Sequence, residues 1–254
     1  MAIQKSDPDY VTALVRGLSV IRCFDKGFES LTLSEVAARS GLTRGTARRF
    51  LLTLEAIGYV SQNDRTFRLS PKVLDLGYAY LASVPLWEQA QPLMKEIVDQ
   101  IDESCSLAVL NGTDVVYLAR VPPRHLHTLP VHVGTRMPAY VNSMGRVLLA
   151  ELEDADLDEY FRHAELRKLN RYTVTSETVL RRILHDIRKN GYSMLEHELH
   201  EGRRSMAVPI RNRDSVAVAS INVSALMSRA TKKEFVDRFL PLLKNAAFLI
   251  GKAI

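Results

Sequence analysis

The stretch LTLSEVAARSGLTRGTARRFLLTLEAIGYVSQNDRTFRL, residues 31–69, decides the fold of the N-terminal third of this chain. Thr32 and Glu35 have the spacing of a capping box, which predicts a helix that starts there and runs to about Ser40. Gly41 follows, and glycine easily adopts the left-handed conformation that ends a helix. The first part of the stretch therefore predicts a short helix that stops at a glycine turn.

A second helix follows the glycine turn, with Thr43 at its N-cap and Gly58 at its end. Its apolar residues recur at intervals of three and one, which places them on one helical face. Two short alternating runs between Tyr59 and Leu69 flank an Asn-Asp turn and predict a β-hairpin. Helix, turn, helix and hairpin in this order outline a winged helix-turn-helix.

The polar face of the second helix is cationic, because no acidic residue occurs in it before Glu55. Arginine can bond guanine edges or phosphates, and a helix N-terminus favours phosphate. We therefore expect the start of this helix and the hairpin tip to contact DNA. The candidate residues are Thr43, Arg44, Gly45, Thr46, Arg48 and Arg49 on the helix, and Arg65 and Arg68 at the hairpin. The alternatives are a solvated face of a structural helix and a winged-helix adaptor that binds protein.

The composition is that of a globular chain, with 46% hydrophobic and 25% charged residues among 254. The net charge is +5, and the first 80 residues are the denser in positive charge. No apolar run reaches the ~18 residues of a membrane span, and the N-terminus lacks the apolar core of a secretory signal. The two cysteines lie far apart and have no ligand spacing. We expect a cytoplasmic protein without a membrane segment, disulfide, metal or cofactor.

Beyond about residue 82 the pattern changes from helices to a mixture of strands and helices. Helices are expected over 10–25, 86–101, 142–152, 156–163, 177–189 and 231–252, and another helical stretch begins at Pro71. Strands are expected over 106–110, 115–121, 128–133, 192–196, 205–210 and 216–223. The order has no βαβ regularity, which favours an α+β fold with an antiparallel sheet. We place the domain boundary between residues 1–81 and 82–254, within a helical linker.

A helix start in the second part of the chain offers a site for a carboxylated small molecule. A turn at Gly134 leads through Pro138 into a helix that Asn142 or Ser143 caps. Free N–H groups near Ser143, Met144 and Gly145 could hold a carboxylate there. The alternative is that the polar residues only cap the helix.

The last predicted strand adds polar groups to this candidate site. Asn222 and Ser224 alternate with apolar residues, so their side chains share one face of the strand. Polar side chains on an inward face are costly unless they are paired or face a ligand, whereas on an outward face they would simply be solvated. Arg136 could pair with a ligand carboxylate or with Glu198, and we favour an ion pair that fixes a loop.

Three phrases resemble the IclR family of bacterial transcription regulators and occur in the order found there. They are GLTRGTARRFLLTLEAIGYV (41–60), VGTRMPAYVNSMGRVLLA (133–150) and GYSMLEHELHEGRRSMAVPI (191–210). The resemblance covers nearly the whole chain, and LTRGTARRFLLTL and SMGRVLLA are most similar to the branch that controls protocatechuate and β-ketoadipate catabolism. It implies that residues 82–254 form a GAF-like effector-binding and oligomerisation domain, in a homodimer or a dimer-of-dimers tetramer.

The resemblance also implies where an effector binds. The family's contacts correspond to Ser143, Met144, Leu195, Ser205, Asn222 and Ser224, with Glu198 nearby. Family members often have a small residue at the position of Met144 and an acidic residue near Leu195. These departures disfavour a very small oxoacid and favour a more apolar aromatic or dicarboxylic acid.

The sequence is interpreted as an effector-responsive regulator that binds double-stranded operator DNA, with aromatic-acid catabolism as the expected target. The main alternative is a small-molecule-binding enzyme whose N-terminal helices only mediate dimerisation. Such an enzyme needs convergent acid, base or nucleophile groups, and no catalytic residue is identified. His197 and His200 lack the zinc-protease spacing, and His125 and His127 are better explained as exposed histidines than as metal ligands.

Overall fold

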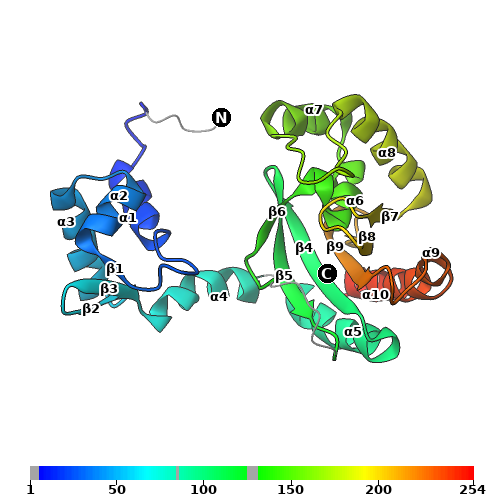
Figure 1. The fold of residues 1–254 in the computed structure, drawn as a ribbon, viewed down its shortest axis with the longest axis horizontal. Coiled ribbons are helices and arrows are strands. Elements are labelled where there is room, and N and C mark those ends of the chain that lie inside the picture. Colours follow the sequence, from blue (N-terminus) through cyan, green and yellow to red (C-terminus); the bar gives the residue numbers. More distant parts are fainter. Residues whose placement is uncertain (1–5, 84–85, 125–130) are drawn as a thin grey trace. The chain divides into compact units, whose positions relative to one another are not determined.

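The computed structural model describes residues 6–83, 86–124 and 131–254, and it divides into two compact units, Met1–Ala82 and Ser83–Ile254. Each unit has its own sheet and its own buried core, so each is described separately (Figure 1). Among the described residues, no helix is both long and apolar enough to cross a lipid bilayer.

The N-terminal unit is a winged helix-turn-helix, as the sequence predicts. Its helices are α1 (Thr12–Ile21), α2 (Leu33–Ser40) and α3 (Arg44–Ala56). Its antiparallel sheet has the order β1 (Leu31–Thr32), β3 (Thr66–Leu69), β2 (Val60–Asn63). The hairpin β2–β3 is the predicted one, whereas β1 is too short to show an alternating pattern in the sequence. A 3-10 turn η1 (Pro71–Val73) and helix α4 (Leu74–Ser83) follow.

Local capping fixes the turn between α2 and α3. Thr32 Oγ1 accepts from the Glu35 N–H at 3.4 Å, and the Glu35 carboxylate accepts from the Thr32 N–H at 2.7 Å, which completes the predicted capping box. Gly41 ends α2 with φ +67°, and Thr43 Oγ1 caps α3 at 3.3 Å from the Thr46 nitrogen. Both helix boundaries are therefore set by the predicted residues.

Helix α1 is shorter than predicted, because it ends at Ile21 instead of continuing to about residue 25. After the C-cap at Arg22 the chain turns inward, and Cys23 is buried in the core of the unit. Four apolar residues at the start of this segment stay exposed on the N-terminal unit, whereas Ile21 packs against its core. The side chains of Val11, Leu14, Val15 and Leu18 are 45–63% exposed.

The C-terminal unit is built on a six-stranded sheet in which every neighbouring pair is antiparallel, as predicted. Its order is β6 (Arg136–Pro138), β5 (Asp114–Val121), β4 (Ser104–Asn111), β9 (Ala217–Leu226), β8 (Arg203–Arg211), β7 (Ser193–Glu196). Helices α5 (Leu86–Ile101) and α10 (Leu240–Lys252) cover one face (Figure 1). The short α9 (Lys232–Glu234) and π-helical η3 (Phe235–Phe239) lead into α10.

The other face of the sheet is covered by η2 (Ala139–Val141) and α6 (Ser143–Glu151). Helices α7 (Asp154–His163) and α8 (Glu177–Asn190) pack outside α6 in the same core cluster. The first eight residues of α6 are all buried. A Cβ on Gly145 would lie 2.3 Å from the Ala139 carbonyl oxygen, so only glycine fits at this position. Helix α6 is therefore a fixed central element of the unit.

The strand predicted over residues 128–133 is not found where expected. Residues 128–130 lie outside the described residues, and Val131–Val133 is not strand. The edge strand is β6 instead, which pairs with β5 after a turn at Gly134, where φ is +84°. The prediction is therefore wrong for residues 131–133, because the chain there enters the turn at Gly134 instead of pairing with a neighbouring strand.

Candidate functional site

The N-terminal unit presents an exposed cationic surface at the start of α3. Ala47, Leu51 and Leu54 point into the core, so the opposite side of the helix faces solvent. Arg44, Arg48 and Arg49 are exposed on that side, and no hydrogen bond or ion pair holds their guanidinium groups within the described part of the chain. A cation without an internal partner is free to bind an external anion.

The hairpin extends this cationic surface. Arg65 follows the left-handed turn residue Asp64, and Arg68 lies on β3; both side chains are exposed. Gly45 has open space around it, which allows a close approach of another backbone. Thr43 and Thr46 bond each other, their hydroxyl oxygens 2.9 Å apart. The eight candidate residues thus lie on α3 and on the hairpin of one unit.

Arg39 shows how a structural arginine differs in the same unit. Its Nε donates to the Cys23 carbonyl at 2.9 Å, and its Nη2 lies 2.9 Å from the Asp25 carboxylate. Its guanidinium also lies 3.8 Å from the centre of the Phe28 ring. All three contacts connect α2 to the segment after α1, so Arg39 has a structural role.

A pocket in the C-terminal unit lies between the sheet and the start of α6. On the sheet, Arg120 pairs with Ser106 across β5 and β4, and Ser106 pairs with Asn222 across β4 and β9. Two residues along, Ser224 pairs with Ser205, and Ser205 with Leu195. Side chains two apart on a strand share a face. The five polar side chains of these rows form a polar floor on β5, β4, β9 and β8, Leu195 borders it on β7, and all six side chains line the pocket.

The start of α6 closes the pocket opposite this floor. Asn142 caps the helix, since its Oδ1 accepts from the Met144 N–H at 2.9 Å while its Nδ2 donates to Tyr117 Oη at 3.0 Å. Ser143 follows, and its hydroxyl is buried against the pocket. Burial raises the pKa of the Tyr117 phenol, so this group stays neutral at physiological pH.

Among the residues that the structure describes, three buried polar atoms of the pocket have no hydrogen-bond partner: Arg120 Nη2, Ser143 Oγ and Asn222 Oδ1. Buried polar groups are normally hydrogen-bonded, because an unmade bond costs about 1–3 kcal/mol. Three such atoms around one pocket make it a candidate site for a polar ligand.

The pocket is electropositive. Burial lowers the pKa of Arg120, and Arg203 nearby lowers it further; burial likewise lowers the pKa of Arg203. Burial and Arg203 also lower the pKa of His200 at the pocket. Glu198 is the acidic residue among the described residues that line the pocket, and it is neutralised by Arg146, whose guanidinium nitrogens lie 2.8 and 2.6 Å from its two carboxylate oxygens. The chemistry of the pocket thus favours an anion with an apolar body.

Six of the nine predicted effector-binding residues line this pocket: Ser143, Leu195, Glu198, Ser205, Asn222 and Ser224. The other three lie elsewhere. Gly134 is in the turn before β6, where its N–H donates to the Tyr117 carbonyl. Met144 and Gly145 are buried within α6, and Met144 belongs to the core cluster.

The expected pairing of Arg136 with Glu198 is wrong. Arg136 lies on the edge strand and fixes the β4–β5 turn, where its guanidinium contacts Asp114 at 3.0 Å and the Asn111 carbonyl at 2.9 Å. Arg146 takes the place beside Glu198, one helical turn into α6. The preference for a loop-fixing ion pair at Arg136 is thus correct, but with a different partner.

Sequence reasoning missed the pocket cations Arg120 and Arg203. Arg120 breaks the apolar run of β5 near its end, whereas Arg203 is the first residue of β8. A charge inside a largely buried strand is a signal that could have identified Arg120, and no comparable signal marks Arg203. Among the described residues, no group of three or more potential metal ligands is found, and His125 and His127 lie outside them. Cys23 and Cys105 are buried free thiols, and burial raises the pKa of each.

Two family models match the chain. Residues 13–64 match the IclR helix-turn-helix domain, and residues 78–251 match the bacterial transcriptional regulator IclR C-terminal domain. Together the two matches cover most of both units.

Curated and solved relatives agree with these matches. The Pca regulon regulatory protein of Pseudomonas putida is 40% identical over 95% of this chain and 83% of its own length. The crystal structure of a transcriptional regulator from Rhodococcus sp. RHA1 has a TM-score of 0.86 and 44% identity over 95% of this chain and 97% of that one. An IclR homologue from Microbacterium hydrocarbonoxydans, solved with 4-hydroxybenzoate, has a TM-score of 0.82 and 25% identity over 94% and 97%.

Proposed function

This chain belongs to the IclR family of bacterial transcriptional regulators, and from that premise we propose that its pocket binds an aromatic acid and that α3 carries the DNA contacts. It is a regulator rather than an enzyme. The relative named for the Pca regulon and the homologue that holds 4-hydroxybenzoate support an aromatic-acid effector. On this proposal, residues 1–81 bind operator DNA, and residues 82–254 bind the effector.

The observation that carries the effector proposal is the buried Nη2 of Arg120, which has no partner in the described part of the chain, in a pocket with apolar side walls. A guanidinium binds a carboxylate through charge-assisted hydrogen bonds. Val141, Leu195 and Leu199 provide the apolar surface for a ring. Ser143 Oγ and Asn222 Oδ1 are then available for a ring substituent such as a hydroxyl group.

The pocket has to widen to receive such a ligand. Its free volume is about 40 Å³, whereas a cavity of about 150 Å³ holds a benzene ring. The polar floor belongs to central strands and α6 is buried, so neither can move easily. The long, partly exposed side chain of Arg120 can turn aside and then close on the carboxylate.

A binding screen tests the effector proposal. Thermal shift and calorimetry with 4-hydroxybenzoate, 3,4-dihydroxybenzoate and β-ketoadipate would compare aromatic monoacids with a dicarboxylate. A ligand at 100 times its Kd stabilises the folded state by about 2.7 kcal/mol. Arg120→Met should weaken binding roughly 10-fold to 100-fold, because a hydrogen bond to a charged group is worth about 1.5–3 kcal/mol. Arg124→Met is the matched control, since Arg124 is exposed and pairs with Asp99.

The polar floor provides a second test of the same site. Asn222→Leu and Ser224→Val should abolish the response to the effector while DNA binding survives, because both side chains lie in the C-terminal unit. Electrophoretic mobility shifts with and without ligand would measure both properties. A normal response in both variants would place the effector elsewhere.

We also propose that the chain works as a homodimer or a dimer of dimers. The exposed side chains of Val11, Leu14, Val15 and Leu18 support an apolar contact through α1. A two-fold pair of N-terminal units would read half-sites about 34 Å apart, or a multiple of that spacing. Light scattering of the purified chain tests the assembly, and a monomer that still binds its operator would contradict it.

A further inference from the structure

The connection between β7 and β8 forms one wall of the pocket. His197, Leu199 and His200 line the pocket from this connection, which leaves the sheet after Glu196 and returns at Arg203. His197 has a positive φ of 64°, and its N–H donates to the Arg203 carbonyl at 2.8 Å. Residues 198–201 between these two points lie outside the strand pairing of the sheet. Their position therefore depends on contacts from outside the sheet.

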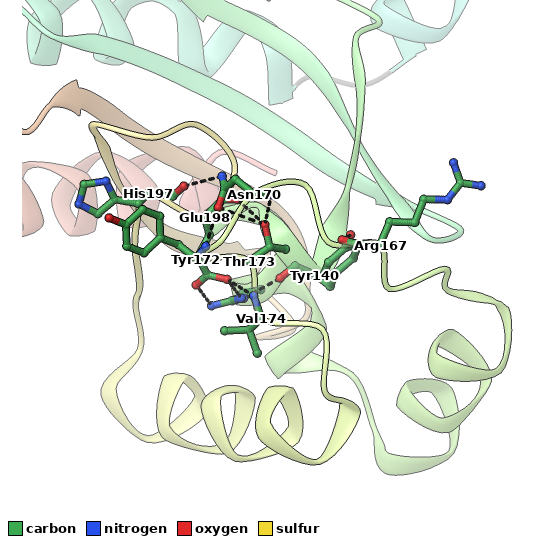
Figure 2. Close-up of polar contacts among 9 residues, drawn as sticks. Tyr140, Arg167, Asn170, Tyr172, Thr173, Val174, His197 and Glu198 are labelled. Atoms are coloured by element: carbon green, nitrogen blue, oxygen red, sulfur yellow. Dashed lines mark hydrogen bonds and ion pairs between the residues drawn. The ribbon is translucent and has the colours of Figure 1, made fainter.

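Residues 170–174 hold this wall from its outer side, and none of them lines the pocket (Figure 2). We call this segment the strap. Asn170 Nδ2 donates to the carbonyls of His197 and Glu198, at 2.9 and 3.0 Å. Thr173 Oγ1 donates to the Glu198 carbonyl at 3.0 Å. Three side-chain hydrogen bonds thus fix two successive carbonyls of the wall.

Aromatic stacking adds to these hydrogen bonds. The Tyr172 ring stacks on the His197 ring, with centroids 4.6 Å apart and planes 25° from parallel. The Arg171 guanidinium lies 4.8 Å from the centre of the Tyr172 ring. Tyr172 is 40% exposed, so its contribution to the buried core is small. The main contact of the Tyr172 ring among the described residues is with His197 of the wall.

The Glu198 side chain ties the wall to α6. Besides its two contacts with Arg146, its carboxylate accepts from the Val174 N–H at 3.1 Å. Arg146 is 2% exposed, and its Nε donates to the Tyr140 carbonyl at 2.7 Å. A carboxylate bonded in this way is poorly suited to bind an acid, because like charges repel. The contacts of the Glu198 carboxylate with Arg146 and Val174 instead hold the wall in place.

We propose that Glu198, Arg146 and the strap are positioning residues that hold the pocket wall at residues 197–200 in the shape that binds the effector. This inference rests on the proposed function. A wall that is already ordered loses less conformational entropy when ligand binds, so a loosened strap weakens binding without any lost ligand contact. A side chain that never touches the effector, such as Thr173, then sets its affinity.

A matched pair of variants at Thr173 tests the proposal. Thr173→Val keeps the shape but removes the hydroxyl, which donates to the Glu198 carbonyl and accepts from the Asn170 N–H within the strap. Thr173→Ser keeps the hydroxyl and removes a methyl group. We expect Thr173→Val to weaken binding of the acid found in the screen about 5-fold, the equivalent of one lost hydrogen bond, and Thr173→Ser to bind as the wild type does. Equal affinity in both variants, or a loss only in Thr173→Ser, would overturn the proposal.

A second pair guards against misfolding of the buried Thr173 variants. Tyr172→Phe keeps the ring on His197, and Tyr172→Ala removes it at a largely exposed position. Calorimetry should show a weaker Kd for Tyr172→Ala only. Operator binding without effector should be unchanged in all four variants, because none of them alters the N-terminal unit.

Hydrogen–deuterium exchange separates this inference from the proposed function. Thr173→Val should speed exchange of the amides at 197–203, and Thr173→Ser should not. If the wild type binds no acid, the proposed function fails, while the exchange result still decides whether the strap holds the wall. Unchanged exchange at 197–203 in Thr173→Val would overturn the positioning role whatever the binding result.

Discussion

Two sets of arginines, one in each unit, have opposite environments. On α3 of the N-terminal unit, Arg44, Arg48 and Arg49 are exposed and have no described partner. In the C-terminal unit, Arg146 and Arg204 are 2% and 6% exposed and contact Glu198 and Glu196 at 2.6 and 2.7 Å. An exposed free cation can bind a polyanion with little loss of hydration, whereas a buried one must be paired for the fold to tolerate it.

The exceptions show that pairing, rather than the unit, decides the role. Arg39 lies in the N-terminal unit, yet its contacts with Asp25 and Cys23 make it structural. Arg120 lies in the C-terminal unit, yet its buried Nη2 has no partner within residues 6–83, 86–124 and 131–254. An arginine whose bonding is incomplete within the chain is therefore the better candidate for a ligand contact.

The largest effect that this comparison predicts is on stability. Arg146→Ala leaves the Glu198 carboxylate buried without its cation, so the free energy of unfolding of the C-terminal unit should fall by about 3–5 kcal/mol. Chemical denaturation followed by a probe in each unit measures this loss. The double variant Arg146→Met/Glu198→Leu should recover most of it, since no charge is then left unpaired. A loss below about 1 kcal/mol would mean that the pair is not structural.

The next effect concerns DNA. Arg48→Ala and Arg49→Ala should each weaken operator binding by about 1–3 kcal/mol if that side chain reads a base. Because neither guanidinium has an internal partner, the unfolding free energy should not change. Arg16→Ala is the matched control, as Arg16 is exposed on α1 of the same unit. Fluorescence anisotropy with labelled operator measures the affinities, and unchanged binding in both variants would remove α3 from the interface.

The hairpin should contribute less than α3. Arg65 lies at the tip, where a wing touches phosphates rather than base edges, so Arg65→Ala should weaken binding to operator and to random duplex alike. The slope of log affinity against log salt concentration should become shallower by about 1. A loss confined to the operator sequence would instead assign Arg65 to base recognition.

Local signals made the N-terminal unit predictable from sequence. Thr32, Gly41 and Thr43 each form a contact or conformation with residues a few positions away, and each was found as predicted. The end of α1 was mispredicted because the inward turn at Cys23 depends on tertiary burial. In the three-stranded sheet of this unit, the alternating pattern of residues predicted the hairpin strands β2 and β3. It did not predict β1, which has only two residues.

The pocket was less predictable, because its geometry comes from pairing between distant strands. Asn222 and Ser224 could be placed on one strand face from their spacing. Arg120 enters the same site only through its register with Ser106, which no local pattern reveals. Similarly, the partner of Glu198 lies 52 residues away on α6, so Arg136 was an equally reasonable choice from sequence alone.

The smallest expected effect is the loss of an exposed ion pair, which tests whether an ion pair must be buried to stabilise the C-terminal unit. Arg162 and Glu159 form an ion pair on α7, but their side chains are 67% and 52% exposed. Exposed pairs of this kind contribute about 0.3–0.5 kcal/mol on a helix, because water and salt screen the charges. Arg162→Ala should therefore leave the unfolding free energy of the C-terminal unit nearly unchanged, measured under the same conditions as Arg146→Ala. A loss above about 1 kcal/mol would show that pairing alone stabilises this unit, and the contrast between exposed and buried arginines would then have to be abandoned.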